Sequence, residues 1–220
     1  MNVPQSQPSA CDRPLVKLGS SCAKGISSNQ DSGLAMLVCQ YKESESYQWQ
    51  EHDLYKWYGD KALTLEAAVD RAFKSEQPNG KLHGHQHLVG RERLARLATT
   101  AKDYIERFKD ARDWNEIYTI VGDTIVQVPG AGILAHYDIT NRIGSYFRYD
   151  QTVVRVHAGA WAGAAVLGLK IQNGQVNLED LPPELRSLGA MHIENFLCIY
   201  KDELKQLNRL KMNHVNEGAS

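Results

Sequence analysis

The stretch Val128-Pro129-Gly130-Ala131-Gly132 constrains the fold most, because helical patterning runs into it and out of it again. Glycine tolerates positive φ, so a Pro-Gly-x-Gly sequence lets the backbone turn tightly. The sequence therefore predicts a short hairpin that joins two helices. Such a turn directs backbone N–H groups outward beside a helix N-terminus, a geometry that binds phosphate. A purely structural connection between two helices is the alternative interpretation.

The segments around the hairpin carry apolar residues at helical spacing. Asp113 is the expected N-cap of a helix that leads into the hairpin, and residues 133–147 continue helically after it. Thr64 is the expected N-cap of another helix at residues 65–74. Gly90-Arg91 opens a further amphipathic helix.

The C-terminal part of the chain follows the same pattern. Residues 158–165 are mostly Ala and Gly, which indicates that one helix packs closely against another. Residues 153–156 form a short valine-rich run that resembles a strand in isolation. Apart from that run, apolar periodicity is helical throughout. The predicted fold class is therefore all-α, in one compact domain or two helical lobes.

The domain organisation is predicted from composition. Residues 1–30 are rich in Ser, Pro, Gln, Asn and Gly, as expected for a flexible lead-in. Residues 31–210 form the helical domain, with the hairpin at residues 128–132. Residues 211–220 carry little apolar content and are expected to fray.

Composition indicates an ordinary globular protein, with 42% hydrophobic and 23% charged residues. No apolar run is long enough to cross a bilayer, and the N-terminus lacks a secretory signal pattern, so no membrane is expected. Cys11, Cys22, Cys39 and Cys198 have no CxxC spacing, so neither a zinc site nor a disulfide framework is expected. An intracellular location follows, with no cofactor and no identifiable protein partner.

A net charge of −1 does not by itself indicate nucleic-acid binding, because DNA-coating domains are usually basic. The charge is uneven, however. Basic residues gather in one central window, namely Lys81, Arg91, Arg93, Arg96, Lys102, Arg107, Lys109 and Arg112. A locally basic face and an ordinary solvated helix surface both account for this window.

Three histidines, His83, His85 and His87, alternate with other residues before the amphipathic helix. In an extended segment they would share one side, which suggests a metal site and, with it, a metal-dependent hydrolase. No fourth ligand or supporting partner is visible in the sequence, so no metal is assigned. Structural hydrogen bonding or contact with DNA phosphates is favoured for His83, His85, Gln86 and Arg91.

Residues 114–168 resemble the helix-hairpin-helix superfamily of DNA base-excision glycosylases. The family pattern is a helix, a Leu-Pro-Gly-x-Gly hairpin, a second helix and a segment holding the catalytic aspartate. Residues 128–132 match the hairpin, with Val128 in place of leucine. Asp150 lies where the catalytic aspartate falls, and Arg155-Val156 matches the arginine-hydrophobe pair that follows it. The resemblance implies a glycosylase-like helical architecture and covers about a quarter of the chain.

The sequence also departs from the family pattern. Bifunctional members carry a lysine two residues after the last hairpin glycine, where this chain has Leu134. Lyase chemistry through a Schiff base is therefore not expected. The four-cysteine iron–sulfur site of some members is also absent. Both departures are compatible with a monofunctional glycosylase and with a relative that cleaves nothing.

The resemblance implies DNA as the partner, bound at its phosphates by Pro129, Gly130, Ala131 and Gly132. It implies a glycosylase that flips a modified or damaged base out of the duplex. Asp150 would then stabilise positive charge on the sugar or activate a water, and Asp138 and His157 are further catalytic candidates. Ordinary structural roles stay open for these catalytic candidates. A non-catalytic DNA-binding module and the metal-dependent hydrolase are the alternative functions.

Overall fold

The computed structural model describes residues 32–217, with the side chains of residues 33–210. The lead-in predicted at residues 1–30 lies outside the described residues. The described chain divides into two compact units. Unit 1 is Trp49–Asp150, and unit 2 combines residues 32–48 with residues 151–217. No helix that the structure describes is both long and apolar enough to cross a membrane.

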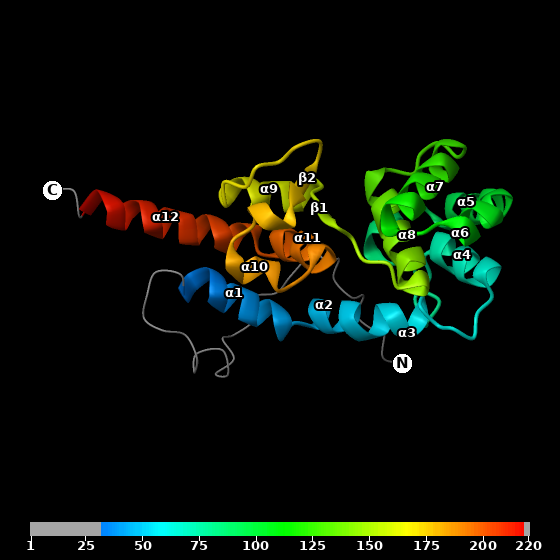
Figure 1. Ribbon diagram of the computed structural model, residues 1–220, viewed down its shortest axis with the longest axis horizontal. Coiled ribbons are helices and arrows are strands. Elements are labelled where there is room, and N and C mark those ends of the chain that lie inside the picture. The colour runs from blue at the N-terminus through cyan, green and yellow to red at the C-terminus, as the bar shows by residue number, and fades with distance from the viewer. Residues whose placement is uncertain (1–31, 218–220) are drawn as a thin grey trace, which may run out of the picture. The chain divides into compact units, whose positions relative to one another are not determined.

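Unit 1 is built from helices, of which Figure 1 labels α3 to α8. In chain order they are the π-helical η2 (Trp49–Leu54), α3 (Tyr55–Trp57), α4 (Leu65–Lys74), the 3-10 helix η3 (Gly84–His87), α5 (Arg91–Ala101), the 3-10 helix η4 (Lys102–Tyr104), α6 (Ile105–Asp110), α7 (Trp114–Val126) and α8 (Ile133–Phe147). α4 packs on α5, and α7 packs on α8. Their shared core includes Phe73, Leu97, Phe108, Ile117 and Ile139, all of which are fully buried.

The predicted helix starts of unit 1 are confirmed. The Thr64 hydroxyl accepts a hydrogen bond from the Ala67 N–H at the start of α4, at 3.2 Å. The Asp113 carboxylate accepts one from the Glu116 N–H at the start of α7, at 2.8 Å. These caps satisfy N–H groups that have no acceptor inside the helix.

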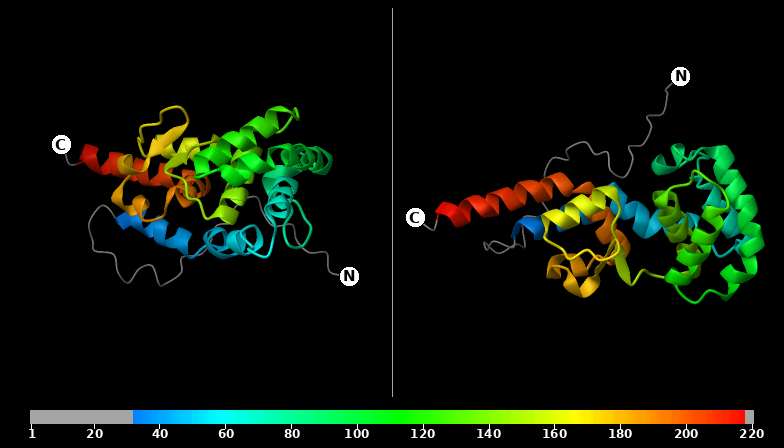
Figure 2. Two further views of the ribbon diagram at one scale, coloured as in Figure 1. Left: turned by 45° about the vertical axis from the view of Figure 1, so that its right-hand side comes forward. Right: turned by 90° about the horizontal axis from the view of Figure 1, so that it is seen from above.

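Unit 2 is assembled from the two ends of the described chain. Its elements are α1 (Ser32–Lys42), α2 (Glu45–Gln48), β1 (Val153–Arg155), α9 (Ala158–Val166), β2 (Gln175–Asn177), the 3-10 helix η5 (Leu178–Asp180), α10 (Pro183–Arg186), α11 (Ala190–Ile199) and α12 (Lys201–Glu217). α9 lies beside α12 (Figure 2) and packs on α11. α12 extends through most of residues 211–220, where a frayed tail is predicted.

The chain is mostly helical, as predicted, but unit 2 also contains two short strands. β1 pairs antiparallel with β2, and Val154 lies opposite Val176 with both side chains fully buried. Asn173 and Gly174 form the turn before β2 with positive φ values of 51° and 72°. β-branched residues favour this extended pairing, so the valine-rich run forms the strand that its local sequence indicates.

The close helix packing expected for residues 158–165 is confirmed. A Cβ at Gly163 would lie 2.2 Å from the Leu197 carbonyl oxygen, and one at Gly159 would lie 2.5 Å from Cys198 Sγ. Neither position has room for a side chain. The small residues of α9 therefore let its backbone touch α11 directly.

The expectation that the cysteines form no disulfides was wrong. Cys39 and Cys198, the cysteines that lie within the described residues, are both disulfide-bonded. Disulfide formation requires Cα atoms roughly 4.4–6.8 Å apart in the folded chain. Sequence spacing does not reveal such distances, which explains why the absence of a CxxC pattern was uninformative here.

Candidate nucleic-acid-binding site

The predicted hairpin joins α7 to α8 as an exposed turn. α7 ends at Val126 and α8 begins at Ile133, so residues 127–132 make the connection. Val128 is buried and anchors the turn to the core, whereas Pro129 and Gly130 are exposed. Gly130 has a φ of 97°, a conformation that other residues rarely adopt. The sequence thus predicted both the turn and the helices on either side of it.

The backbone of the hairpin presents hydrogen-bond donors. No side chain caps the start of α8. Within the described part of the chain, the N–H groups from Gly130 to Ala135 donate to no backbone or side-chain acceptor. A helix N-terminus also carries partial positive charge. The hairpin can therefore accept an anionic group.

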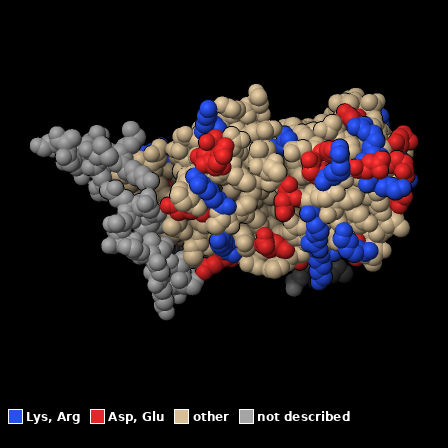
Figure 3. Space-filling model, in the orientation of Figure 1, with Lys and Arg blue, Asp and Glu red and all other residues tan. Residues whose placement is uncertain are grey.

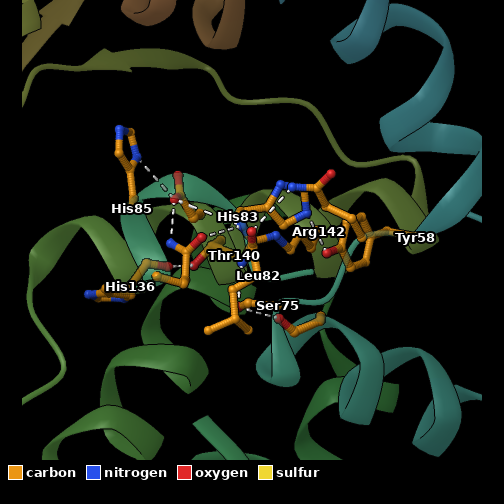
Figure 4. Close-up of polar contacts among 12 residues, drawn as sticks. Tyr58, Ser75, Leu82, His83, His85, His136, Thr140 and Arg142 are labelled. Carbon is orange, nitrogen blue, oxygen red and sulfur yellow. Dashed lines mark hydrogen bonds and ion pairs between the residues drawn. The ribbon is translucent and has the colours of Figure 1, made fainter. Parts of the chain in front are cut away.

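The turn that holds the three histidines packs on α8, and Figure 4 labels His83 and His85 of this region together with Arg142 of α8. Gln86 has no solvent exposure. Its Nε2 donates to Asp138 Oδ2 at 2.6 Å, and its Oε1 accepts from the Arg142 guanidinium at 2.9 Å. Direct DNA contact by Gln86 was predicted, but its side chain is fully engaged inside the unit.

Arg142 is the central cation of this group and is only 4% exposed. It donates to Ser75 Oγ at 2.7 Å and lies 5.4 Å from the centroid of the Tyr58 ring. It also lies 3.9 Å from Asp138 Oδ2. A buried guanidinium with these partners ties α8 to the end of α4 and to η3.

Asp138 is a carboxylate of the same network. Burial opposes its ionisation, but the hydrogen bond from His85 and the charge of Arg142 hold its pKa below the usual value. His85 Nδ1 lies 3.4 Å from Asp138 Oδ2. Its contacts thus give Asp138 a role in holding η3 on α8, and none of them is with Asp150.

His83 is a neutral histidine. Burial and then the charge of Arg142 lower its pKa to about 3. Its Nε2 lies 2.8 Å from the Tyr58 hydroxyl, which also lies 3.0 Å from the Glu76 carbonyl oxygen. Because a carbonyl can only accept, the one Tyr58 proton goes to Glu76, and His83 donates from Nε2. His83 therefore has a structural hydrogen bond rather than an exposed, charged face for DNA.

The geometry does not support the metal-dependent hydrolase. The predicted extended segment is instead the 3-10 helix η3, which follows His83 and contains His85 and His87. His83 contacts Tyr58, His85 contacts Asp138, and His87 is exposed. Within residues 33–210, no group of three or more His, Cys, Asp or Glu side chains is arranged to hold a metal ion.

Asp150 is exposed and lies three residues beyond the end of α8. Burial and then the negative charge of Asp150 raise the pKa of the Tyr55 hydroxyl, so the two side chains are near neighbours. The Arg148 guanidinium lies 4.6 Å from the Tyr55 ring centroid. Asp138 is more than two turns back along α8, about 14 Å from its end at 1.5 Å per residue.

The three predicted catalytic residues are not gathered in one unit. Asp138 and Asp150 belong to unit 1, whereas His157 belongs to unit 2. His157 directly precedes α9 and is half-buried. Asp150 is therefore the one exposed residue among the three catalytic candidates.

Four of the eight basic side chains of the central window pair with acids of unit 1. The pairs are Arg91 with Glu76, Arg107 with Asp123, Lys109 with Glu106 and Arg112 with Glu116. On the face that Figure 3 draws, basic and acidic side chains lie next to one another over this unit. Arg91, predicted to contact DNA, also donates to the Gly80 carbonyl. Half of the window's basic side chains are thus paired with carboxylates.

Arg93 is a residue that the sequence did not single out. Its guanidinium lies against Gly130 of the hairpin.

Comparisons of the chain with protein-family models, curated proteins and solved structures found no match. The geometry of unit 1 and the resemblance of its hairpin motif are therefore the grounds for a function.

Proposed function

We propose that unit 1 binds DNA through the hairpin at residues 127–132. The observation that carries the proposal is an exposed turn followed by the uncapped start of α8, where the N–H groups from Gly130 to Leu134 donate to no other described residue. Phosphate oxygens accept such donors, and backbone N–H groups contact phosphates without reading base sequence. The resemblance of residues 114–168 to helix-hairpin-helix glycosylases supports the same partner.

Exposed apolar side chains beside the hairpin support a nucleic-acid partner. Val126 and Ile133, at its two ends, are 73% and 54% exposed. Leu88 is 93% exposed and precedes Val89, whose carbonyl accepts a hydrogen bond from Arg93. Because Arg93 also touches Gly130, Leu88 lies near the hairpin. Apolar side chains that enter a base step are common in proteins that bend or open a duplex.

The proposed reaction is hydrolysis of the N-glycosidic bond of a modified or damaged base, without lyase chemistry. An exposed Asp150 can approach a flipped nucleotide, stabilise positive charge on its sugar and activate a water. Flipping costs about a few kcal/mol and is easiest for damaged bases. Leu134 in the position of the family's lysine supports a monofunctional enzyme.

A non-catalytic DNA-binding module is the second candidate. The contacts of Asp138 favour it, because this second predicted acid–base group of unit 1 is engaged by Gln86, His85 and Arg142 rather than placed beside Asp150. Such a module would bind duplex DNA with an affinity that falls as salt rises, and it would release no base.

Base release separates the two candidates. The purified full chain is incubated with duplexes that carry uracil, oxidised, alkylated or hypermodified bases, and abasic sites are measured by strand cleavage in alkali. Abasic sites that disappear in Asp150→Asn, with DNA affinity retained, support the glycosylase. A fully active Asp150→Asn variant removes Asp150 as the catalyst, and no release from any duplex favours the binding module.

DNA binding itself is tested by two matched glycine variants. Gly130 and Gly80 both have positive φ, at 97° and 75°, and both lie in exposed turns of unit 1. Gly130→Ala places a Cβ against the Arg93 guanidinium, whereas Gly80→Ala meets nothing within 4 Å. We expect Gly130→Ala alone to weaken duplex binding, by about tenfold for the loss of roughly one charge-assisted hydrogen bond. Equal affinities for both variants would contradict the hairpin assignment.

A DNA-binding role implies a location in a nucleoid or a nucleus. The disulfides of Cys39 and Cys198 oppose this location, because disulfides persist mainly in oxidising compartments. Thiol alkylation at the moment of cell lysis, followed by mass measurement, tests it. Alkylated Cys39 and Cys198 support the proposed location, and blocked thiols contradict it.

A further inference from the structure

The side chain of Arg93 occupies the space that a side chain at Gly130 would need. A Cβ at Gly130 would lie 2.8 Å from Arg93 Nε, 2.9 Å from Cζ and 3.1 Å from one terminal nitrogen. Glycine is therefore favoured at position 130 by its positive φ, and any larger residue there would also displace the flexible end of Arg93. Arg93 comes from α5, so the hairpin and a distant helix share this contact.

Arg93 differs from Arg91 in its hydrogen-bond and ion-pair partners. One terminal nitrogen donates to the Val89 carbonyl at 2.7 Å, which holds the side chain along the start of α5. Within residues 33–210, no carboxylate lies within ion-pair distance of Arg93, whereas Arg91 is 2.5 Å from Glu76. A guanidinium has five N–H donors, and this hydrogen bond uses one. A fixed cation thus stands beside the N–H groups of the hairpin.

We propose that Arg93 contacts the DNA phosphate that the hairpin binds and is the principal charged side chain of this interface. This inference rests on the proposed function. A guanidinium matches a phosphate with two parallel hydrogen bonds, and its planar fork already lies against Gly130. Arg91, two residues earlier on α5, is engaged by Glu76 and by the Gly80 carbonyl.

The first test compares Arg93→Ala with the matched control Arg91→Ala. The affinity for a fluorescent duplex is measured by anisotropy from 50 to 200 mM salt, and folding is checked by circular dichroism. We expect Arg93→Ala to weaken binding by about 10- to 100-fold and to reduce the salt slope by about 0.9, the value for one lost phosphate contact. Arg91→Ala should change affinity by about twofold or less.

Arg93→Lys is the control that separates the loss of charge from the loss of side-chain packing. It keeps the charge and a long stem but loses the paired hydrogen bonds, so binding should be intermediate with an unchanged salt slope. If Arg93→Ala binds the duplex with wild-type affinity and slope, the inference is overturned while the proposed function stands.

A chain that binds no duplex would overturn the proposed function. Binding of inorganic phosphate then tests the role of Arg93 separately. Amide resonances of Gly130 and Gly132 and the Arg93 Nε–H are followed by NMR of the labelled full chain during a phosphate titration. Saturable shifts of all three that vanish in Arg93→Ala support an anion site that uses Arg93. Shifts that persist in Arg93→Ala, or no shifts in the wild type, overturn the inference.

Discussion

Acidification should destabilise unit 1 through His83, well above the pH at which carboxylates titrate. Burial and the charge of Arg142 lower the pKa of His83 from its ordinary 6.5 to about 3 in the folded chain. Between pH 6.5 and about pH 3, His83 is therefore protonated in the unfolded chain and neutral in the folded chain. The stability that His83 contributes is complete above pH 6.5 and is lost as the pH falls from 6.5 toward 3.

The magnitude follows from the pKa difference. Each unit corresponds to 1.36 kcal/mol, so at about pH 5, which is 1.5 units below 6.5, the loss is roughly 2 kcal/mol. That is a large fraction of a typical unfolding free energy of about 5–15 kcal/mol. The hydrogen bond between His83 Nε2 and Tyr58 is lost at the same time only if the ring moves, because protonated Nε2 still donates.

His83→Gln is the matched variant for this prediction. The glutamine amide can donate to the Tyr58 hydroxyl in place of Nε2, but it does not titrate. Unfolding free energies of both proteins are measured by urea at about pH 7.5 and pH 5. The wild type should lose roughly 2 kcal/mol more than the variant between these values. The subtraction removes the titration of the other histidines.

One outcome would refute the reasoning. If the two proteins lose stability equally, to within about 0.5 kcal/mol, His83 is not a buried neutral side chain. NMR gives an independent check, since the His83 ring should show no titration step between about pH 7 and pH 5. A step near 6.5 would place the imidazole in water and would contradict its buried hydrogen bond with Tyr58.

Three further changes are predicted. Arg142→Met should lower the free energy of unfolding in urea by about 3–5 kcal/mol, because it leaves buried partners unpaired. The exposed Arg91→Met should lower it by about 1 kcal/mol or less, and equal losses would contradict the buried network. Gly163→Ala should cost about 1–3 kcal/mol, since its Cβ would lie 2.2 Å from a carbonyl oxygen, and an unchanged unfolding midpoint would contradict the close packing of α9. Leu88→Ala should weaken duplex binding several-fold in anisotropy measurements, whereas Leu210→Ala, an exposed leucine of unit 2, should not.

Local sequence predicted the helices of unit 1 well because their signals are local. Thr64 and Asp113 satisfy N–H groups three residues away, so their capping role is visible in a short window. The strand at 153–155 shows the opposite case. Its valines indicate extended structure, but the partner strand lies about twenty residues later, and the helical surroundings outweighed the local signal in the all-α prediction.

The polar network could not be predicted from the sequence. Gln86 and Asp138 are 52 residues apart, and Ser75 and Arg142 are 67 apart. Gln86 carries no hydrophobic or periodic signal that marks it as fully buried, so its side chain was assigned to DNA. The same reason explains the choice of Arg91 over Arg93. Both are basic residues of one helix turn, and only the fold shows which one meets Glu76 and which one meets Gly130.

The hairpin and the polar network around Gln86 are both positioned by α8. α8 carries the hairpin at its start and presents Asp138 and Arg142 to Gln86 along its length. Gln86 lies in the turn that leads into α5, which brings Arg93 onto the hairpin. The buried contacts of Gln86 with α8 therefore help to hold Arg93 of α5 beside Gly130, where we propose that the phosphate binds. Gln86→Ala should consequently weaken the proposed duplex binding in anisotropy measurements, although the Gln86 side chain is fully buried.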